Sequence, residues 1–391
     1  MESAKNYMGG GGVGGGGGLL KDHYFAGHAA AASSAVLASS LLTHPLDTLK
    51  TLLQLAAASS RQMGLAQVVD RVRSVSGLSG LYNGFGWSTM GKISGLGARF
   101  GTYEILTAFY KDGREDDYVY VSEALLAGIA AGTVEAVMCT PFELFKLRNQ
   151  VTSASHCRTM SPVQSAQEAN PMIPKLLPRY TPDARALQQT LGILSTLSTK
   201  HTEISGALKL NPWMLTGSGR PPLPSEVRRP LDVVSLEGWG ALWRSLRSGI
   251  ARDSVFGGVF FSTWQFFHIG MLNWKALDIY PPPRSINEVG PVSPLAASLA
   301  AGFSGALAAS LSHTFATAKS RSQCTVIPKY IAMERKLLRW EAPGIWIERV
   351  TGMSPADRNI MFRGFWMRNA RCGIGSFAVV GGYYLAVDHL L

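Results

Sequence analysis

The sequence predicts an all-α membrane protein, in which three tandem two-helix repeats form a six-transmembrane-helix bundle with pseudo-threefold symmetry. Two observations lead to this fold class: a pattern that returns three times along the chain, and apolar segments long enough to cross a membrane. Charged residues make up only 16% of the 391 residues, while 46% are hydrophobic and 42 are glycine. That balance favours a membrane protein over two or three soluble domains.

The recurring pattern is a proline or threonine, followed by a basic residue five positions later and a glutamine nine positions later. It begins at Pro45, Pro141 and Thr314. Further along each copy, an aromatic residue, a polar or basic residue and a small residue follow one another, at 82–84, 243–245 and 362–364. Because a repeat period sets the architecture of such a protein, we place the repeats at residues 22–115, 120–275 and 290–391, the third being degenerate.

Three segments without a charged residue are long enough to span a bilayer, at residues 24–43, 254–274 and 291–318. A helix needs about 20 such residues to cross a hydrocarbon core of about 30 Å. Segments 93–110, 124–140 and 372–387 are shorter or carry a charge, and we accept them because the repeat places them. The spans are rich in Ala, Gly and Ser, which allow helix backbones to approach closely in lipid.

Two segments lie outside the repeated elements. Residues 1–20 form a glycine-rich leader that we expect to be disordered, because it lacks both the apolar core of a secretory signal and the Arg-rich amphipathic pattern of a presequence. The second repeat contains an insertion at about residues 151–230, with nine Lys or Arg against four Asp or Glu. We interpret it as a flexible basic loop, apart from a predicted helix at 182–199 capped by Thr181.

The net charge of +11 favours anionic partners. No nucleic-acid motif accompanies the basic residues, so lipid head groups and anionic solutes are the expected partners. The four cysteines have neither disulfide nor metal spacing, and the chain has no phosphate-binding loop and no nucleophile elbow. We therefore expect no metal, no cofactor and no enzymatic activity.

The repeated patterns resemble those of the mitochondrial carrier family. In that family Pro-x-acid-x-x-base ends each odd-numbered helix, and an acidic-Gly element and an aromatic-base-Gly element precede each even-numbered helix. Glu237-Gly238 followed by Trp243-Arg244 fits the second pair of elements, with Ser245 in place of Gly. The resemblance covers nearly everything except the leader and the insertion. It implies a solute carrier of the mitochondrial inner membrane that works by alternating access.

The resemblance also implies a gate at the matrix side. Proline removes a backbone donor and kinks a helix, so Pro45 and Pro141 would let the odd-numbered helices converge at one end. Ion pairs at that convergence can break and re-form as the state changes. The implied pairs are Asp47 with Lys146 and Glu143 with Lys319, braced by three glutamines. We name the full set the matrix gate: Asp47, Lys50, Glu143, Lys146, Lys319, Gln54, Gln150 and Gln323.

The third repeat departs from the family pattern. Ala316 replaces the acid, so Lys50 lacks its expected partner and the matrix gate should hold at most two of three ion pairs. At the outer face the aromatic-acid-x-x-base element expected of carriers is incomplete, because Thr107, His268 and Val387 stand at the basic position. An outer gate without cations must close by packing or hydrogen bonds.

Most candidate substrate residues lie at or next to one depth of the even-numbered helices, seven positions after each small residue, while Arg368 lies one helical turn before Arg371 and Glu135 lies inside the third helix. An ionisable residue at membrane depth is costly and usually faces a water-filled path. An Arg followed by an acid resembles the amino-acid-transporting carriers, which implies that Arg252 holds a carboxylate and Asp253 an ammonium group. A structural helix–helix ion pair is the alternative for these two, as it is for Glu135 and Lys92. The candidate set is Gly91, Lys92, Glu135, Arg252, Asp253, Arg368 and Arg371.

These observations predict transport of an amino acid or an amino-acid-like zwitterion. A carrier for a carboxylate, nucleotide or cofactor anion is the first alternative, since the candidate set holds more cations than anions. A non-transporting membrane structural protein is the second. The expected partners are the solute and inner-membrane lipid, with no nucleic acid, and the protein is expected to be a monomer. Cardiolipin is expected near Gly84, Ser245 and Gly364.

Overall fold

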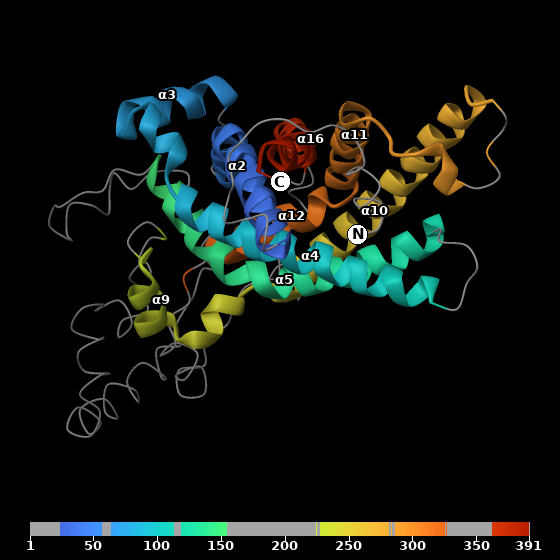
Figure 1. Cartoon of the computed structure of the whole chain (residues 1–391). Helices are drawn as coiled ribbons and strands as arrows, with labels where there is room; N and C mark the ends of the chain where they lie inside the picture. Colours follow the sequence, from blue (N-terminus) through green and yellow to red (C-terminus); the bar gives the residue numbers. More distant parts are fainter. Residues whose placement is uncertain are drawn as a thin grey trace, which may run out of the picture.

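The computed structural model describes residues 24–56, 64–112, 119–154, 227–280, 286–324 and 362–390, together with residues 224, 283 and 326. Within these ranges the regular elements are α-helices and short 3-10 helices, and no strand occurs among them, which confirms the predicted all-α fold class (Figure 1). The predicted leader, the predicted helix at 182–199 and nearly all of the insertion lie outside the described residues.

Each repeat contains two long helical segments. The odd-numbered segments are α2 (Tyr24–Ala56), α5 (Val121–Thr152) and, in the third repeat, α11 (Pro294–Leu311) followed by α12 (His313–Cys324). The even-numbered segments are α4 (Phe85–Lys111), α10 (Leu246–Leu277) and α16 (Phe365–Leu390). Short elements join them: α3 (Leu65–Ser76) and η2 (Leu78–Tyr82) in the first repeat, and α9 (Pro230–Glu237) and η3 (Trp239–Trp243) in the second. A last short element, η4 (Ile286–Val289), precedes α11.

The long helices form a closed ring in chain order. Helix α2 packs on α4, α4 on α5, α5 on α10, α10 on α11, α11 on α16, and α16 returns to α2. In Figure 1 the short helices α3 and α9 lie at the left of the molecule, whereas the C-terminal ends of α4 and α10 extend to the right. The linkers of the first two repeats are thus at one end of the bundle, and the connections between repeats are at the other.

Among the described residues, four helical segments combine the length and the apolar composition of a membrane span: Val121–Thr152, Trp239–Leu277, Pro294–Leu311 and Phe365–His389. Helices α2 and α4 complete the ring, with 33 and 27 residues. At 1.5 Å per residue, both exceed the roughly 30 Å of a hydrocarbon core. Large apolar side chains point outward from the bundle, as expected of a surface in contact with lipid; examples are Leu41, Ile105, Leu126, Phe266 and Leu299.

Helices α5 and α10 touch backbone to backbone. A Cβ atom added to Gly132 would lie 2.0 Å from the carbonyl oxygen of Asp253, and one added to Gly128 would lie 2.4 Å from that of Gly257. No side chain larger than hydrogen fits there. This is the packing that small residues permit in a membrane, where hydrophobic exclusion contributes little to helix association.

The prolines do not interrupt their helices. α2 and α5 continue through Pro45 and Pro141, whereas the odd-numbered segment that lacks the proline breaks at Ser312, between α11 and α12. Pro45 leaves the carbonyl of Leu41 without its helical donor. The hydroxyl of Tyr82 donates to that oxygen over 3.5 Å, so the neighbouring 3-10 helix compensates for part of the loss.

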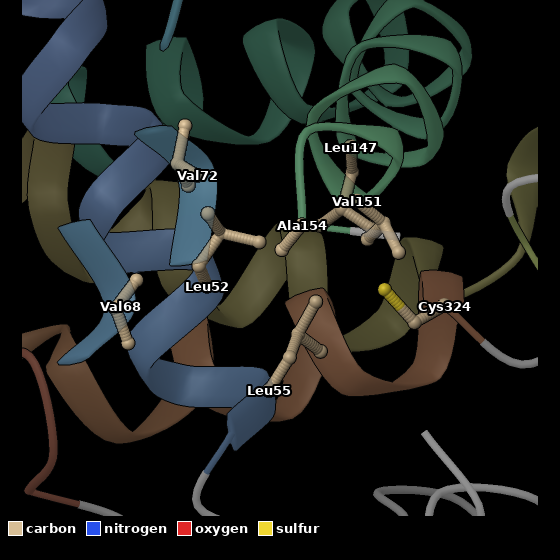
Figure 2. Close-up of a cluster of buried hydrophobic side chains, with 8 residues drawn as sticks. All are labelled: Leu52, Leu55, Val68, Val72, Leu147, Val151, Ala154 and Cys324. Atoms are coloured by element: carbon tan, nitrogen blue, oxygen red, sulfur yellow. The ribbon is translucent and has the colours of Figure 1, made fainter. Parts of the chain in front are cut away.

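Apolar side chains from all three odd-numbered segments meet near their C-terminal ends. Leu55, Val151 and Cys324 occupy equivalent positions, each five residues after the lysine of its gate motif. Figure 2 shows them in one buried cluster: Leu52, Leu55, Val68, Val72, Leu147, Val151, Ala154 and Cys324. The odd-numbered segments therefore converge directly beyond the charged residues of the matrix gate.

Candidate substrate and gate site

Asp47 on α2 holds two cations. Lys146 of α5 forms an ion pair with its Oδ2 atom, and Arg371 of α16 forms one with its Oδ1 atom. The amide of Gln150 donates to Asp47 Oδ2 at 3.3 Å and to the hydroxyl of Thr48 at 3.2 Å. The pair with Lys146 and the glutamine beside it have the geometry that the resemblance implies, while their role as a gate stays a prediction.

Glu143 on α5 holds two cations in the same way. Lys319 of α12 forms an ion pair with Oε2, and Arg252 Nη2 lies 2.9 Å from Oε1. Arg252 also donates through Nε and Nη2 to the two oxygens of Asp253, each at 2.7 Å. Arg252 therefore bridges two carboxylates. Lys319 Nζ lies 3.9 Å from Asp253 Oδ2 and completes the cluster.

The structure thus joins two sets of residues that the sequence analysis treats separately. Each gate carboxylate, Asp47 or Glu143, binds one lysine of the gate and one arginine of the candidate substrate set. The repeat register gave the depth of Arg252 and Arg371 along their helices but not the direction of their side chains. Contacts between helices decide that direction, because α16 packs on α2 and α10 packs on α5.

The third position of the ring has no carboxylate. Ala316 is buried there, 2% exposed. Lys50, which would be its partner by the repeat symmetry, is also buried and has no hydrogen bond or ion pair within the described part of the chain. Arg368 of α16 is buried nearby and donates through Nη2 to the hydroxyl of Ser312 at 2.6 Å.

The remaining glutamines of the gate contact threonines. Gln54 donates to the hydroxyl of Thr317 at 3.0 Å, and Gln323 donates to the carbonyl of Thr140 at 3.5 Å. Thr317 occupies the same repeat position as Thr48, so the contact of Gln54 with Thr317 is equivalent to that of Gln150 with Thr48. Only the first and third repeats provide a hydroxyl at this position, since the second has Leu144.

The other candidate substrate residues have partners of their own. Lys92 Nζ donates to the hydroxyl of Thr43 at 3.3 Å. Gly91 lies under Phe142, where an added Cβ would be 2.9 Å from that of the phenylalanine. Glu135 forms an ion pair with Arg99, whose guanidinium carbon lies 4.8 Å from the ring centre of Phe256. Glu135 thus joins α5 to α4. This is the helix–helix ion pair that the sequence left open as the alternative to a substrate contact.

One buried ionic cluster was not predicted from the sequence. The fully buried carboxylate of Glu237 pairs with Arg148 of α5 and with Arg244. Arg148 Nη1 also donates to the carbonyl of Val227 at 3.0 Å. The sequence contains a signal for this cluster, because Arg148 follows the lysine of its gate motif by two positions and Glu237 belongs to the acidic-Gly element. The cluster fastens α9 and η3 to α5.

At the opposite end the described contacts are hydrogen bonds and ring stacking. The hydroxyl of Tyr383 lies 2.9 Å from Nδ1 of His28, which joins α16 to α2. The ring of Tyr103 stacks on Phe261 with centroids 3.8 Å apart. Gln265 donates to the carbonyl of Val119 at 2.9 Å. These contacts are of the kind that the sequence predicts for an outer gate without cations, and that role stays a prediction.

Six long helices in a closed ring, built from three repeats and holding buried charges at one end, define a polytopic α-helical membrane protein. Residues 21–114 match the family model described as mitochondrial carrier protein, which confirms the predicted resemblance to that family. The match covers the first repeat, whose α2 and α4 hold Asp47 and Lys92.

Curated relatives belong to the same group of proteins. The chain is 36% identical over 121 residues to the mitochondrial tricarboxylate transport protein of Bos taurus, 29% of this chain and 38% of the relative. It is 32% identical over 113 residues to the mitochondrial glycine transporter of Homo sapiens, 28% of this chain and 36% of the relative. It is 30% identical over 123 residues to the mitochondrial brown fat uncoupling protein 1 of Rattus norvegicus, 30% of this chain and 40% of the relative.

Each match therefore spans about two-fifths of the relative's length or less. The family match and the membrane-length helices confirm the predicted localisation in the mitochondrial inner membrane.

Proposed function

We propose that this protein moves a small solute across the mitochondrial inner membrane by alternating access. The observation that carries the proposal is the double coordination of the two gate carboxylates. Asp47 and Glu143 each bind a lysine from an odd-numbered helix and an arginine from an even-numbered helix. Charged groups inside a membrane are expensive, so a protein that served only as a scaffold would gain little from them.

The double coordination gives the solute a way to act on the gate. A solute carboxylate that binds Arg371 or Arg252 takes this arginine away from Asp47 or Glu143, because the guanidinium fork matches a carboxylate of either origin. The gate carboxylate then keeps only its lysine. Since a ligand shifts a conformational equilibrium by its differential affinity for the two states, a solute that competes for the arginines favours opening of the matrix gate.

An amino-acid-like zwitterion is our first candidate for the solute. Asp253 accepts two hydrogen bonds from Arg252 in this conformation, so the pair satisfies itself. When Arg252 turns to a solute carboxylate, Asp253 is released to hold an ammonium group next to it. The name of the human glycine transporter among the relatives supports this choice.

A carboxylate without an ammonium group is the second candidate. The matrix gate and the candidate substrate set together hold four carboxylates, Asp47, Glu135, Glu143 and Asp253, and seven cations. The cations are Lys50, Lys92, Lys146, Lys319, Arg252, Arg368 and Arg371. A surplus of positive charge favours an anionic solute, as the name of the tricarboxylate transport protein of Bos taurus also does.

Transport by purified protein in liposomes tests both candidates. A panel of amino acids, carboxylates, nucleotides and cofactors is offered, and Arg252→Ala is compared with the parent on the best solute. Loss of a charge-assisted hydrogen bond is worth roughly 1.5–3 kcal/mol, which is about a ten- to hundredfold loss of apparent affinity. Arg252→Lys should fall in between, because lysine keeps the charge without the fork. No transport of any panel member by folded protein would contradict the proposal.

Asp253→Asn separates the two candidates. It should abolish transport of an amino acid, whereas transport of a carboxylate should be retained. Glu104→Gln at the exposed outer part of α4 is the matched control, since it removes one negative charge far from the cluster. Equal transport of an amino acid by Asp253→Asn and by the parent would exclude the ammonium contact.

A further inference from the structure

The matrix gate has an unfilled position. In the first two positions an acid of one repeat pairs with the lysine of the next, Asp47 with Lys146 and Glu143 with Lys319. The same rule joins position 316 to Lys50, where the acid is replaced by Ala316. The alanine does not open the site to solvent, because its side chain is 2% exposed. A lysine therefore remains in a buried ring position without its carboxylate.

Among the residues that the structure describes, the surroundings of Lys50 supply no carboxylate besides Asp47. The residue is 7% exposed, and the charged groups that act on it are Asp47, Arg371, Arg368 and Lys146. Three of these are cations. The single carboxylate, Asp47, already holds Lys146 and Arg371.

A second buried cation points to the same place. Arg368 is 5% exposed, and while its Nη2 atom donates to Ser312, its Nη1 atom has no acceptor within the described part of the chain. Gly364, one helical turn before Arg368, lies against Lys50, since a Cβ added there would be 3.6 Å from Lys50 Cγ. Lys50 and the first turn of α16, which leads to Arg368, are thus neighbours.

Two buried cations that share no carboxylate are costly, because a charge taken out of water needs a partner or hydrogen bonds in return. We propose that Lys50 and Arg368 form a binding site for a small carboxylate anion, which takes the place of the gate acid missing at position 316. The bound anion completes the third pair of the matrix gate and stabilises the conformation described here. This inference goes beyond the proposed function, because binding does not require transport.

Thermal unfolding of the purified full-length protein tests the site. Sodium formate replaces sodium isethionate at constant ionic strength, so that only the small carboxylate changes. We expect a saturable rise in melting temperature of about 5 °C at a hundredfold excess over Kd. Absence of any rise, or a linear rise without saturation, would overturn the proposal.

Substitutions assign the effect to these residues. Lys50→Met should abolish the formate-dependent rise, and Lys275→Met at the end of α10 should retain it as a matched loss of one positive charge. Ala316→Asp provides a tethered carboxylate, so its melting temperature should be high without formate and rise no further. A formate response in Lys50→Met equal to that of the parent would refute the assignment, whether or not Ala316→Asp folds.

The carboxylate can come from a free anion or from the transported solute, and competition distinguishes the two sources. A solute found by the transport panel that removes the formate response shares the site. A solute that leaves the response unchanged binds elsewhere, which makes the site one for a free anion. Failure of the transport panel would leave the unfolding experiment intact, so the two proposals can fail separately.

Discussion

The first two repeats and the third all contribute two helical segments to the closed ring, but they differ in the continuity of the odd-numbered segment and in the gate residue that it carries. In the first two, a proline lies within a continuous helix and an acid two positions later holds two cations. In the third, the helix breaks at Ser312, and Ala316 stands at the position of the acid. The ring of helices nevertheless closes, and all three odd-numbered segments reach the apolar cluster of Figure 2. Helix packing therefore tolerates a degenerate repeat, while the pattern of charges does not remain threefold.

This difference shows where asymmetry can enter a symmetric bundle. Small residues at helix contacts allow the helices of the ring to pack closely, and this packing does not depend on which gate residues are charged. The charged ring is a separate layer, in which one substitution leaves a surplus of positive charge. Three comparisons between the repeats test this view.

The largest difference is expected between the two lysines Lys146 and Lys50. Lys146→Met should destabilise the protein by about 1.5–3 kcal/mol, because Asp47 loses one of its two charged partners in a buried site. Lys50→Met should be neutral or stabilising in the absence of a small anion, since it removes a buried charge without a carboxylate. Melting temperatures of the two variants in detergent measure the difference. Equal destabilisation would mean that Lys50 has a partner equivalent to that of Lys146.

The next largest difference is expected in the loss of stability when glycines at contacts between odd- and even-numbered helices are replaced by alanine. At Gly132 in the second repeat an added Cβ would lie 2.0 Å from a backbone oxygen, whereas at Gly302 in the third it would lie 3.3 Å from the carbonyl oxygen of Gly373. Gly132→Ala should therefore cost about 1–3 kcal/mol through overpacking, and Gly302→Ala clearly less. Gly101→Ala, where nothing lies within 4 Å, is the control. A larger loss of melting temperature for Gly302→Ala than for Gly132→Ala would contradict the ranking.

The smallest effect is expected at the residue that precedes each even-numbered helix. Gly84, Ser245 and Gly364 all have positive φ, at 81°, 66° and 75°. Only the second repeat places a residue with a side chain there, and a left-handed conformation costs such a residue about 1–2 kcal/mol. Because glycine also loses more backbone entropy on folding, Ser245→Gly should stabilise by roughly 0.5–1 kcal/mol. A lower melting temperature for Ser245→Gly would show that the serine hydroxyl matters more than the strain.

Much of the fold follows from local information in the chain. The threefold register of Pro45, Pro141 and Thr314 is a property of the sequence, and so are the uncharged runs and the small residues that allow close packing. The pairing of Asp47 with Lys146 and of Glu143 with Lys319 came from the resemblance, and the structure brings these residues together. The interruption at Ser312 was not predicted, because a missing proline indicates a straighter helix rather than a broken one.

What the sequence alone determined is thus the number of repeats, the depth of each charged residue along its helix, and the absence of an acid at position 316. Which charges meet depends on the tertiary structure. It directs Arg252 and Arg371 to the gate carboxylates and pairs Glu135 with Arg99. Within the described residues it leaves Lys50 near Arg368 without an ion pair of its own. The physical reason is that depth depends on the 1.5 Å rise of a single helix, whereas a contact between side chains depends on how two helices are rotated against each other.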